Sequence, residues 1–440
     1  MCKYRLFALA LSFFAFQTVT VSAQVGNPCA TAQYDSLMQH KDPTWKRGRQ
    51  LLESLIQKEV SHIAARTFEE TIFIPVVVHI VHHNALGTIG GTTNANITDE
   101  QILSQIHVLN EDYRRKEGTP GFNKNPVGAD VNIEFYLAKR DPNGHITNGI
   151  TRAYSEQASF NPDNYQDIDL LKSFDYWPSN RYLNIWVATL SNDYLGAAQF
   201  PTVPIDPATG GAAPIGLSAR QADESDGIMI NSKAFGRQTG TAISPVYGYG
   251  RTLTHEIGHW LGLLHTWGDY FCGDDYCNDT PPTESDNKTK DISCQAKYSN
   301  CTGQKTSNMI ENYLDYSPDI CMNIFTQDQK ARMRAVLELS PLRKALVEST
   351  PKVVEAEHLS VNLFPNPTDE AIHIKPFFKG IQDVQVDIIS SQGKAVSTIV
   401  FPNTYSSQLL SIQLPTLASG LYFVKTSTSK ESHVSKLVVR

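Results

Sequence analysis

The stretch of sequence that decides the fold is THEIGHWLGLLH, at residues 254–265. On a helix, His255 and His259 are four residues apart, so their imidazoles lie on one face. Gly262 can adopt the left-handed conformation that ends a helix, which turns the chain back and brings His265 to the same point. Three neutral imidazoles are a typical ligand set for a catalytic zinc ion that keeps one position open.

A carboxylate follows the first of these histidines directly. Glu256 is placed to take a proton from a water molecule at the open position, which is the role of a general base. Histidine makes up only 13 of the 440 residues, so this spacing is improbable by chance. The alternative is a set of structural histidines on an ordinary helix. We favour a zinc site with Glu256 as the base.

The composition excludes several other classes of protein. The 38 Lys and Arg residues against 45 Asp and Glu residues give a net charge of −7, with 41% hydrophobic residues. This describes a folded chain of two or three domains, and it provides no basic surface for nucleic acid. The apolar run at residues 6–16 is too short to span a bilayer as a helix, so no transmembrane segment is predicted.

The N-terminus has the features of a secretory signal peptide. Lys3 and Arg5 precede the apolar run, and the small residues 21–23 follow it at the distance of a cleavage site. We therefore expect residues 1–23 to be removed on export, although a buried N-terminal helix is the alternative. Export leaves six cysteines in an oxidising compartment: Cys29, Cys272, Cys277, Cys294, Cys301 and Cys321.

The rest of the chain divides into two regions by pattern. A helical period over residues 44–63 is followed by a short polar linker, residues 64–67, that a protease could cut. Strand-like runs follow at residues 72–81, 131–137 and 183–187, and two capping boxes that open helices lie at Thr98/Gln101 and Thr326/Gln329. Together they predict an α+β domain. After residue 351, short alternating segments separated by turns predict a small all-β sandwich.

Several stretches together resemble a known family. Residues 255–265 are similar to the extended zinc signature of the metzincin metalloproteases. The neighbouring stretches resemble the pappalysin family, in its bacterial, ulilysin-like branch: LNIWV at 183–187, DGIMI at 226–230, DTP at 279–281, NYLDY at 312–316 and CMN at 321–323. The likeness covers about residues 70–340. It implies a metzincin-like α+β catalytic domain, with a twisted sheet plus helices, a zinc cleft and an irregular lower subdomain.

The resemblance also implies a function, namely a secreted zinc endopeptidase that hydrolyses peptide bonds in proteins. The competing hypothesis is a non-catalytic secreted binding or adhesion protein with a zinc-stabilised fold. Glu256 discriminates between them, because a structural zinc site does not require it. Substrate preference stays open, since Asp319 would favour a basic side chain and the adjacent Ile320 an apolar one.

Two family features concern the region around the zinc site. The family carries a methionine beneath the metal, and this chain has Leu314 there, a change of similar volume. Tyr316 keeps the position from which a phenol can stabilise the oxyanion of the tetrahedral intermediate, unless it is simply a buried tyrosine. The family also implies structural calcium, for which Asp275, Asn278 and Thr280 are the candidates, the alternative being a solvated acidic loop.

The cysteines have expected roles that follow from the same resemblance. It implies the disulfides Cys272–Cys301 and Cys294–Cys321. Family precursors carry a Cys-Gly-Thr whose thiolate occupies the open zinc position, and residues 29–31 here read Cys-Ala-Thr. Cys29 is therefore either a latency switch, released by a cut near Arg66, or the disulfide partner of Cys277. Both alternatives remain open at this point.

The C-terminal stretches LFPNPT at 363–368, SGLYFVK at 419–425 and KLVVR at 436–440 resemble a type IX secretion C-terminal sorting domain. This implies export by that secretion machinery to the medium or cell surface of a Gram-negative bacterium, whereas an adhesive or carbohydrate-binding sandwich is the alternative. The expected domains are a signal peptide at 1–23, a propeptide at 24–66, the protease at 67–350 and the sorting domain at 351–440.

Overall fold

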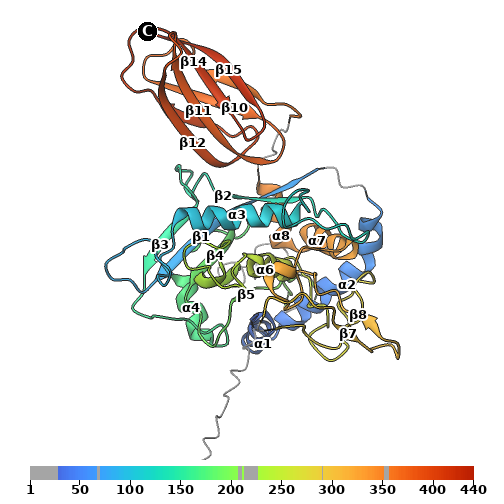
Figure 1. The fold of residues 1–440 in the computed structure, drawn as a ribbon. Coiled ribbons are helices and arrows are strands. Elements are labelled where there is room, and N and C mark those ends of the chain that lie inside the picture. The colour runs from blue at the N-terminus through green and yellow to red at the C-terminus, as the bar shows by residue number, and fades with distance from the viewer. Residues whose placement is uncertain (1–27, 67–69, 207–210, 213–225, 290, 351–355) are drawn as a thin grey trace, which may run out of the picture.

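The computed structural model describes residues 28–66, 70–206, 211–212, 226–289, 291–350 and 356–440. The expected signal peptide lies outside these residues. The described chain contains an N-terminal segment (residues 28–66), a larger mixed part of helices and strands, and a C-terminal part made of strands (Figure 1).

Two helices make up most of the N-terminal segment. The periodicity predicted over residues 44–63 is confirmed by α2, which spans Trp45–Ala64. It buries Leu52, Ile56 and Ile63 against the last part of the mixed domain. Ahead of it lies α1, Thr31–Lys41, which the sequence pattern did not indicate.

A mixed sheet forms the centre of the larger part. The strand order is β2-β1-β4-β6-β5, and β3 pairs with the far end of β1. The strands are β1 (Ile72–His82), β2 (Ile133–Leu137), β3 (Ile150–Tyr154), β4 (Leu183–Ala188), β5 (Gly196–Ala198) and β6 (Ile228–Asn231). These pairs are parallel, except that β5 runs antiparallel to β6 at the edge. Because helices cover both faces of the sheet, side chains on both sides of a strand are buried. This explains why the strands predicted from the sequence are nearly unbroken apolar runs.

Alternate residues of β4 point to opposite faces of the sheet. Ile185 and Val187 face a core that contains side chains of α3 (Asp99–Tyr113), α6 (Arg251–Trp260) and α7 (Gln327–Leu339). Trp186 and Ala188 face a second core with α4 (Tyr165–Ser173) and α1. The predicted capping box of Thr326 and Gln329 opens α7, and Thr98 accepts from the backbone N–H of Gln101 at the start of α3. After α7 comes α8 (Pro341–Ser349), and the described residues also form two short 3-10 turns, η1 (Ser232–Ala234) and η2 (Asp319–Cys321).

The region after α6 is irregular and is held by two disulfides. They join Cys272 to Cys301 and Cys294 to Cys321, each with a Cα–Cα distance of 5.5 Å. These are the pairs that the family resemblance implies. Among the described residues of this region, regular structure is limited to the short hairpin of β7 (Tyr298–Ser299) and β8 (Thr306–Ser307) and to η2. Cross-links of this kind compensate for a small core.

The C-terminal part has two antiparallel sheets that enclose one apolar core. Their orders are β13-β10-β9 and β12-β11-β14-β15. The strands are β9 (Ser360–Phe364), β10 (Ala371–Phe377), β11 (Ile381–Ser390), β12 (Ala395–Tyr405), β13 (Leu410–Gln413), β14 (Gly420–Ser427) and β15 (Ser432–Val439). Alternate residues of β10 are buried, as in a sandwich. The predicted fold class, an α+β domain followed by an all-β sandwich, is confirmed.

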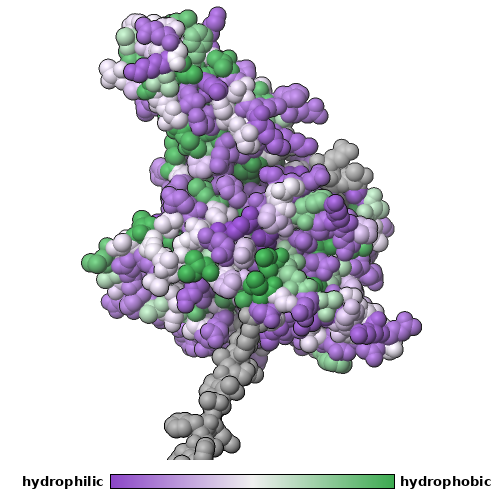
Figure 2. Space-filling view, in the orientation of Figure 1, coloured by the Kyte–Doolittle hydropathy of each residue, from purple (hydrophilic) through white to green (hydrophobic). Residues whose placement is uncertain are grey.

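The sandwich stands on the larger part as a separate lobe (Figure 2). The sandwich contacts the larger part at β2, where the buried carboxylate of Glu134 accepts a hydrogen bond from the backbone N–H of Ile381 at 2.7 Å. Beside it, the rings of Tyr136 and Tyr405 pack with centroids 4.7 Å apart. Among the described residues, no helix has both the length and the apolar character needed to cross a membrane.

Candidate active site

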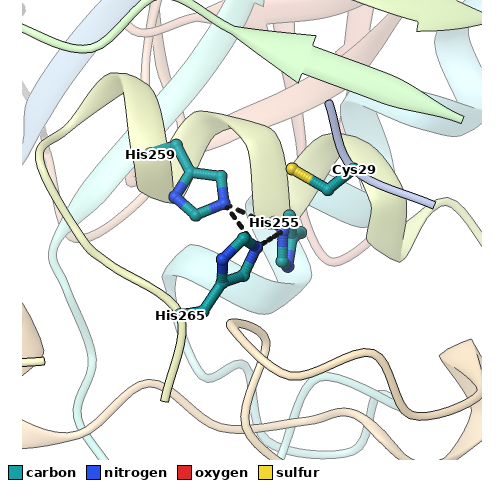
Figure 3. A group of neighbouring side chains, drawn as sticks. All are labelled: Cys29, His255, His259 and His265. Carbon is teal, nitrogen blue, oxygen red and sulfur yellow. Dashed lines mark hydrogen bonds between the residues drawn. The ribbon is translucent and has the colours of Figure 1, made fainter. Parts of the chain in front are cut away.

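The centre of the site is α6 and the turn that follows it. His255 and His259 project from one side of this helix, while Leu253 and Ile257 fix the other side in the core. The helix ends at Trp260, and Gly262 has φ = 86°, the left-handed conformation predicted for it. The chain therefore turns back, and His265 joins the other two imidazoles (Figure 3).

The hydrogen bonds around the three imidazoles determine their tautomers. Each Nδ1 faces an oxygen acceptor: the carbonyl of Tyr313 for His255 at 2.7 Å, the carbonyl of Leu263 for His259 at 2.8 Å, and the carboxylate of Asp269 for His265. Each Nδ1 must then carry the proton, which leaves the Nε2 lone pair free to bind a metal. Burial also lowers the pKa of His255 to about 3, so its imidazole is neutral.

The three Nε2 atoms converge on one point. They are 3.0, 3.1 and 3.2 Å apart, and the histidines are at most 4% exposed. Three lone pairs facing one another without a proton between them repel each other, unless a cation lies among them. The spacing is close to the ~3.3 Å that separates tetrahedral ligands with zinc bonds of ~2.0 Å. The residues present therefore fit zinc.

Neighbouring side chains hold the third histidine in place. Trp267 stacks on the ring of His265 with centroids 4.4 Å apart and an interplanar angle of 6°. Asp269, which sequence reasoning missed, orients the same ring through Nδ1. Its position four residues after His265 is the signal that could have identified it. Leu314, at the place where the family has methionine, is fully buried against Gly258 of α6.

Glu256 lies beside the histidines and is fully buried. Burial raises the pKa of its carboxyl group to about 7. Its Oε2 accepts a hydrogen bond of 2.7 Å from the hydroxyl of Thr31, a contact across 225 positions of sequence that the motif search did not find. Gly196 on the edge strand β5 allows the close approach, because a Cβ there would lie 2.8 Å from Glu256 Oε1.

The thiol of Cys29 reaches the same point from the N-terminal segment (Figure 3). Its Sγ and one nitrogen of each of the three histidines all lie within 4.8 Å of one another. Cys29 is 3% exposed, and burial raises the pKa of its thiol. Neither Cys29 nor Cys277 forms a disulfide with another described cysteine. The Cys29–Cys277 bond that sequence counting left open is therefore not formed in this structure.

Tyr316 completes the wall of the site. It is 4% exposed, and its ring lies 4.9 Å from that of His265 and 5.7 Å from that of His255, measured between centroids. Burial raises the pKa of its phenol, so the hydroxyl keeps its proton. The residue is thus both buried and adjacent to the metal ligands.

A pocket opens beside His255 and Glu256, between α6 and the disulfide-linked region. Asp315, Asp319 and Met322 are among the residues that line it. Asp319 is 2% exposed and lines the pocket, whereas Ile320 is 51% exposed and is not among the lining residues. Of the two residues that sequence analysis left open for substrate preference, Asp319 is the one in the pocket.

Two of the three residues predicted to bind calcium, Asp275 and Thr280, are in direct contact. The hydroxyl oxygen of Thr280 lies within hydrogen-bond distance of three acceptors, the two carboxylate oxygens of Asp275 at 2.9 and 2.8 Å and the carbonyl oxygen of Cys277 at 2.7 Å, and its one proton can bond any of them. Burial raises the pKa of Asp275 to about 7. The backbone N–H of Asn278 donates to Asp328 at 2.8 Å. An oxygen-rich cluster is therefore present at Asp275 and Thr280.

Comparison with known families gives two matches along the chain. A family model described as "Pregnancy-associated plasma protein-A", of the M43 peptidases, matches residues 171–338. A second, described as a secretion system C-terminal sorting domain, matches residues 362–440. The first match contains the three histidines, and the second coincides with the β-sandwich.

Individual relatives agree with these matches. An extracellular metalloprotease of Verticillium alfalfae is 30% identical over 275 residues, 61% of this chain and 77% of that protein. Among solved structures, a promirolysin mutant of Tannerella forsythia is 34% identical with a TM-score of 0.56, covering 73% of this chain and 97% of its own. Mature mirolysin in complex with a cleaved peptide is 38% identical with a TM-score of 0.52, covering 63% and 96%.

Proposed function

The chain belongs to the pappalysin family of zinc metallopeptidases, and on that premise we propose that Glu256 is its general base and that it is made as a latent precursor. The enzyme is a secreted zinc-dependent endopeptidase that acts on proteins. Its C-terminal sandwich is a sorting domain for a secretion system of Gram-negative bacteria. The observation that carries the proposal is the convergence of three unprotonated Nε2 atoms beside a buried carboxylate.

In the proposed mechanism, His255, His259 and His265 would hold a zinc ion through Nε2. Bound zinc supplies Lewis acidity, which polarises the scissile carbonyl and lowers the pKa of a water molecule. Glu256 takes the proton from that water as it attacks, and later gives it to the departing amine. The hydroxyl of Tyr316 donates a hydrogen bond to the oxyanion that forms. The buried carboxylate of Asp319 favours a basic substrate side chain in the adjacent pocket.

Latency is proposed from the position of Cys29. Its sulfur lies with the three imidazole nitrogens, and a soft thiolate is a good fourth ligand for zinc. Cys29 would thereby exclude the catalytic water, while Thr31 holds the carboxylate of Glu256. We propose residues 24–66 as the propeptide, between a signal peptide at 1–23 and a protease at 67–350, with the sorting domain at 351–440.

The competing function, a non-catalytic binding protein with a zinc-stabilised fold, is less well supported. A structural zinc site is closed by four protein ligands and has no use for an adjacent carboxylate. Glu256 is fully buried. Burying a carboxylate costs folding free energy, so a carboxylate without a function is not expected there. Membership of a peptidase family also favours catalysis.

The test of this function compares the precursor with the processed enzyme. The intact precursor is expected to generate no new N-termini in a denatured protein substrate, and the enzyme freed of residues 24–66 is expected to generate many. Mass spectrometry checks both the substrate fragments and the complete loss of the segment. A precursor that cuts the substrate as fast as the processed enzyme would contradict the proposed latency.

A calcium ion at Asp275, Asn278 and Thr280 stays a prediction. Carboxylate, hydroxyl and carbonyl oxygens are the ligands that calcium prefers. If calcium binds there, a calcium-selective chelator should lower the melting temperature of the precursor, and Asp275→Asn should abolish that response. Asp274→Asn, at an exposed neighbouring position, is the matched control. An unchanged melting temperature in the parent protein would remove calcium from the account.

A further inference from the structure

The N-terminal segment is attached to the catalytic part at three separate places, and the first is the edge of the sheet. The backbone N–H of Ala30 donates to the carbonyl of Gly196 at 2.9 Å, and the N–H of Leu195 donates to the carbonyl of Pro28 at 2.8 Å. The hydroxyl of Thr31 also accepts from the N–H of Ala198 at 2.8 Å while it donates to Glu256. Residues 28–30 thus pair with the start of β5 through one parallel bridge, between Cys29 and Gly196.

The second attachment is behind the sheet, where α1 packs beside α4. Tyr34 is 1% exposed, and its hydroxyl donates to Gln199 Oε1 at 2.8 Å. The hydroxyl oxygen of Tyr34 in turn accepts a hydrogen bond from Lys172 Nζ at 2.9 Å. Its ring lies in the core that contains Trp186 and Met229. A buried aromatic with a satisfied hydroxyl is typical of the residues that dominate binding energy at interfaces.

The third attachment is between α2 and α7. The guanidinium of Arg332, whose side chain is 2% exposed, donates two hydrogen bonds to Glu53, at 3.0 and 2.8 Å. Apolar side chains of α2 pack beside this ion pair against Ala335 and Val336. At Gly48 the helix touches the loop after β5, since a Cβ there would lie 2.4 Å from the carbonyl oxygen of Val203. The fit leaves no room for one more methyl group.

The end of the segment contributes little by comparison. Residues 64–66 are exposed, and the one ion pair there joins Arg66 to Glu338 with both side chains more than 40% exposed. Surface ion pairs of this kind add little to binding. A cut after residue 66 therefore leaves all three attachments intact. The cut removes only the covalent link between the segment and the catalytic part. A short flexible link of this kind holds a segment near its site at an effective concentration in the millimolar range.

We infer that the surface under residues 28–64 is a docking site that retains this segment after the linker is cut, so that a single cut yields a two-chain complex that is still inhibited. The inference rests on the latency proposed above and adds the order of activation to it. Release then requires a second cut that separates the attachments from one another. The connection between α1 and α2, with Lys41 and Pro43 exposed, is the accessible place for it.

The first experiment uses the full chain with a recognition sequence for a highly specific protease inserted after Ala65. After complete cutting, gel filtration is expected to show the two chains eluting together, with activity no higher than in the uncut precursor. A variant with a second site after Lys41 is the matched control, and its double cut is expected to release both pieces and the activity. Dissociation and full activity after the single cut would overturn the inference.

The second experiment adds a synthetic peptide of residues 28–66 to the processed enzyme and measures its binding by fluorescence anisotropy. The peptide is expected to bind and to inhibit. Gly48→Ala in the peptide is expected to weaken binding about tenfold or more, as for a methyl group forced into a filled site. Circular dichroism supplies the control, because alanine is the better helix former and the variant peptide is expected to be more helical.

The outcomes separate this inference from the proposed function. An uncut precursor that is already active would contradict the latency itself. If the uncut precursor is inactive and becomes fully active after the single cut, only the proposed retention of residues 28–64 is contradicted. A Gly48→Ala peptide that binds as tightly as the parent peptide would exclude the contact of α2 as a source of affinity and overturn the three-point attachment.

Discussion

Replacing Glu256 by Gln in the processed enzyme is expected to lower kcat/KM for a protein substrate by about 10²–10⁴-fold, the usual contribution of general-base catalysis. The amide has nearly the same shape as the carboxylate but cannot take a proton. Zinc content, measured by mass spectrometry of the metal, should stay at one ion per chain, because the three imidazoles are unchanged. The melting temperature should also stay close to that of the parent enzyme.

The adjacent position supplies a matched control for this substitution. Thr254 precedes the first histidine and is fully buried, and its hydroxyl donates to Asp112 at 2.7 Å, away from the metal ligands. Thr254→Ser keeps that hydrogen bond and is expected to leave kcat/KM nearly unchanged. If the Glu256→Gln enzyme digests the substrate as fast as the parent, the assigned mechanism is wrong.

Removal of zinc is expected to have the second large effect. A chelator should abolish cleavage by the processed enzyme and lower its free energy of unfolding, by about 4 kcal/mol if free zinc had stood a thousandfold above its Kd. The physical reason is the cluster of His255, His259 and His265, whose Nε2 lone pairs face one another at 3.0–3.2 Å without a proton between them. Calorimetry and peptide cleavage measure the two effects.

The zinc prediction has its own controls. Added zinc should restore both activity and stability, and magnesium should restore neither, because imidazole nitrogen suits zinc and not magnesium. His259→Ala should bind little zinc and should show no rescue. Full activity in a preparation with less than about a tenth of an equivalent of zinc would contradict the metal site.

Local patterns were sufficient to predict much of the fold and the centre of the site. The helical spacing of His255 and His259 and the turn at Gly262 depend on neighbours within eleven residues, and the structure has them as expected. The same holds for the capping box of α7 and for the buried strands β1 and β4. Each of these depends on residues close together in sequence.

Other features depend on contacts between distant residues and could not be predicted. Helix α1 carries few apolar side chains, and its best anchor, Tyr34, depends on Lys172 and Gln199 far along the chain. The bond from Thr31 to Glu256 spans 225 positions. Counting cysteines left the partner of Cys29 undecided, because the answer depends on where strand β5 brings residues 28–31.

X-ray absorption at the zinc edge of the purified precursor can show whether three histidines and Cys29 together bind zinc there. We expect one sulfur ligand at about 2.3 Å and three nitrogen ligands at about 2.0–2.1 Å. In the Cys29→Ser precursor the sulfur ligand should disappear while zinc remains. A parent precursor that holds zinc with no sulfur ligand, or holds no zinc at all, would contradict the account.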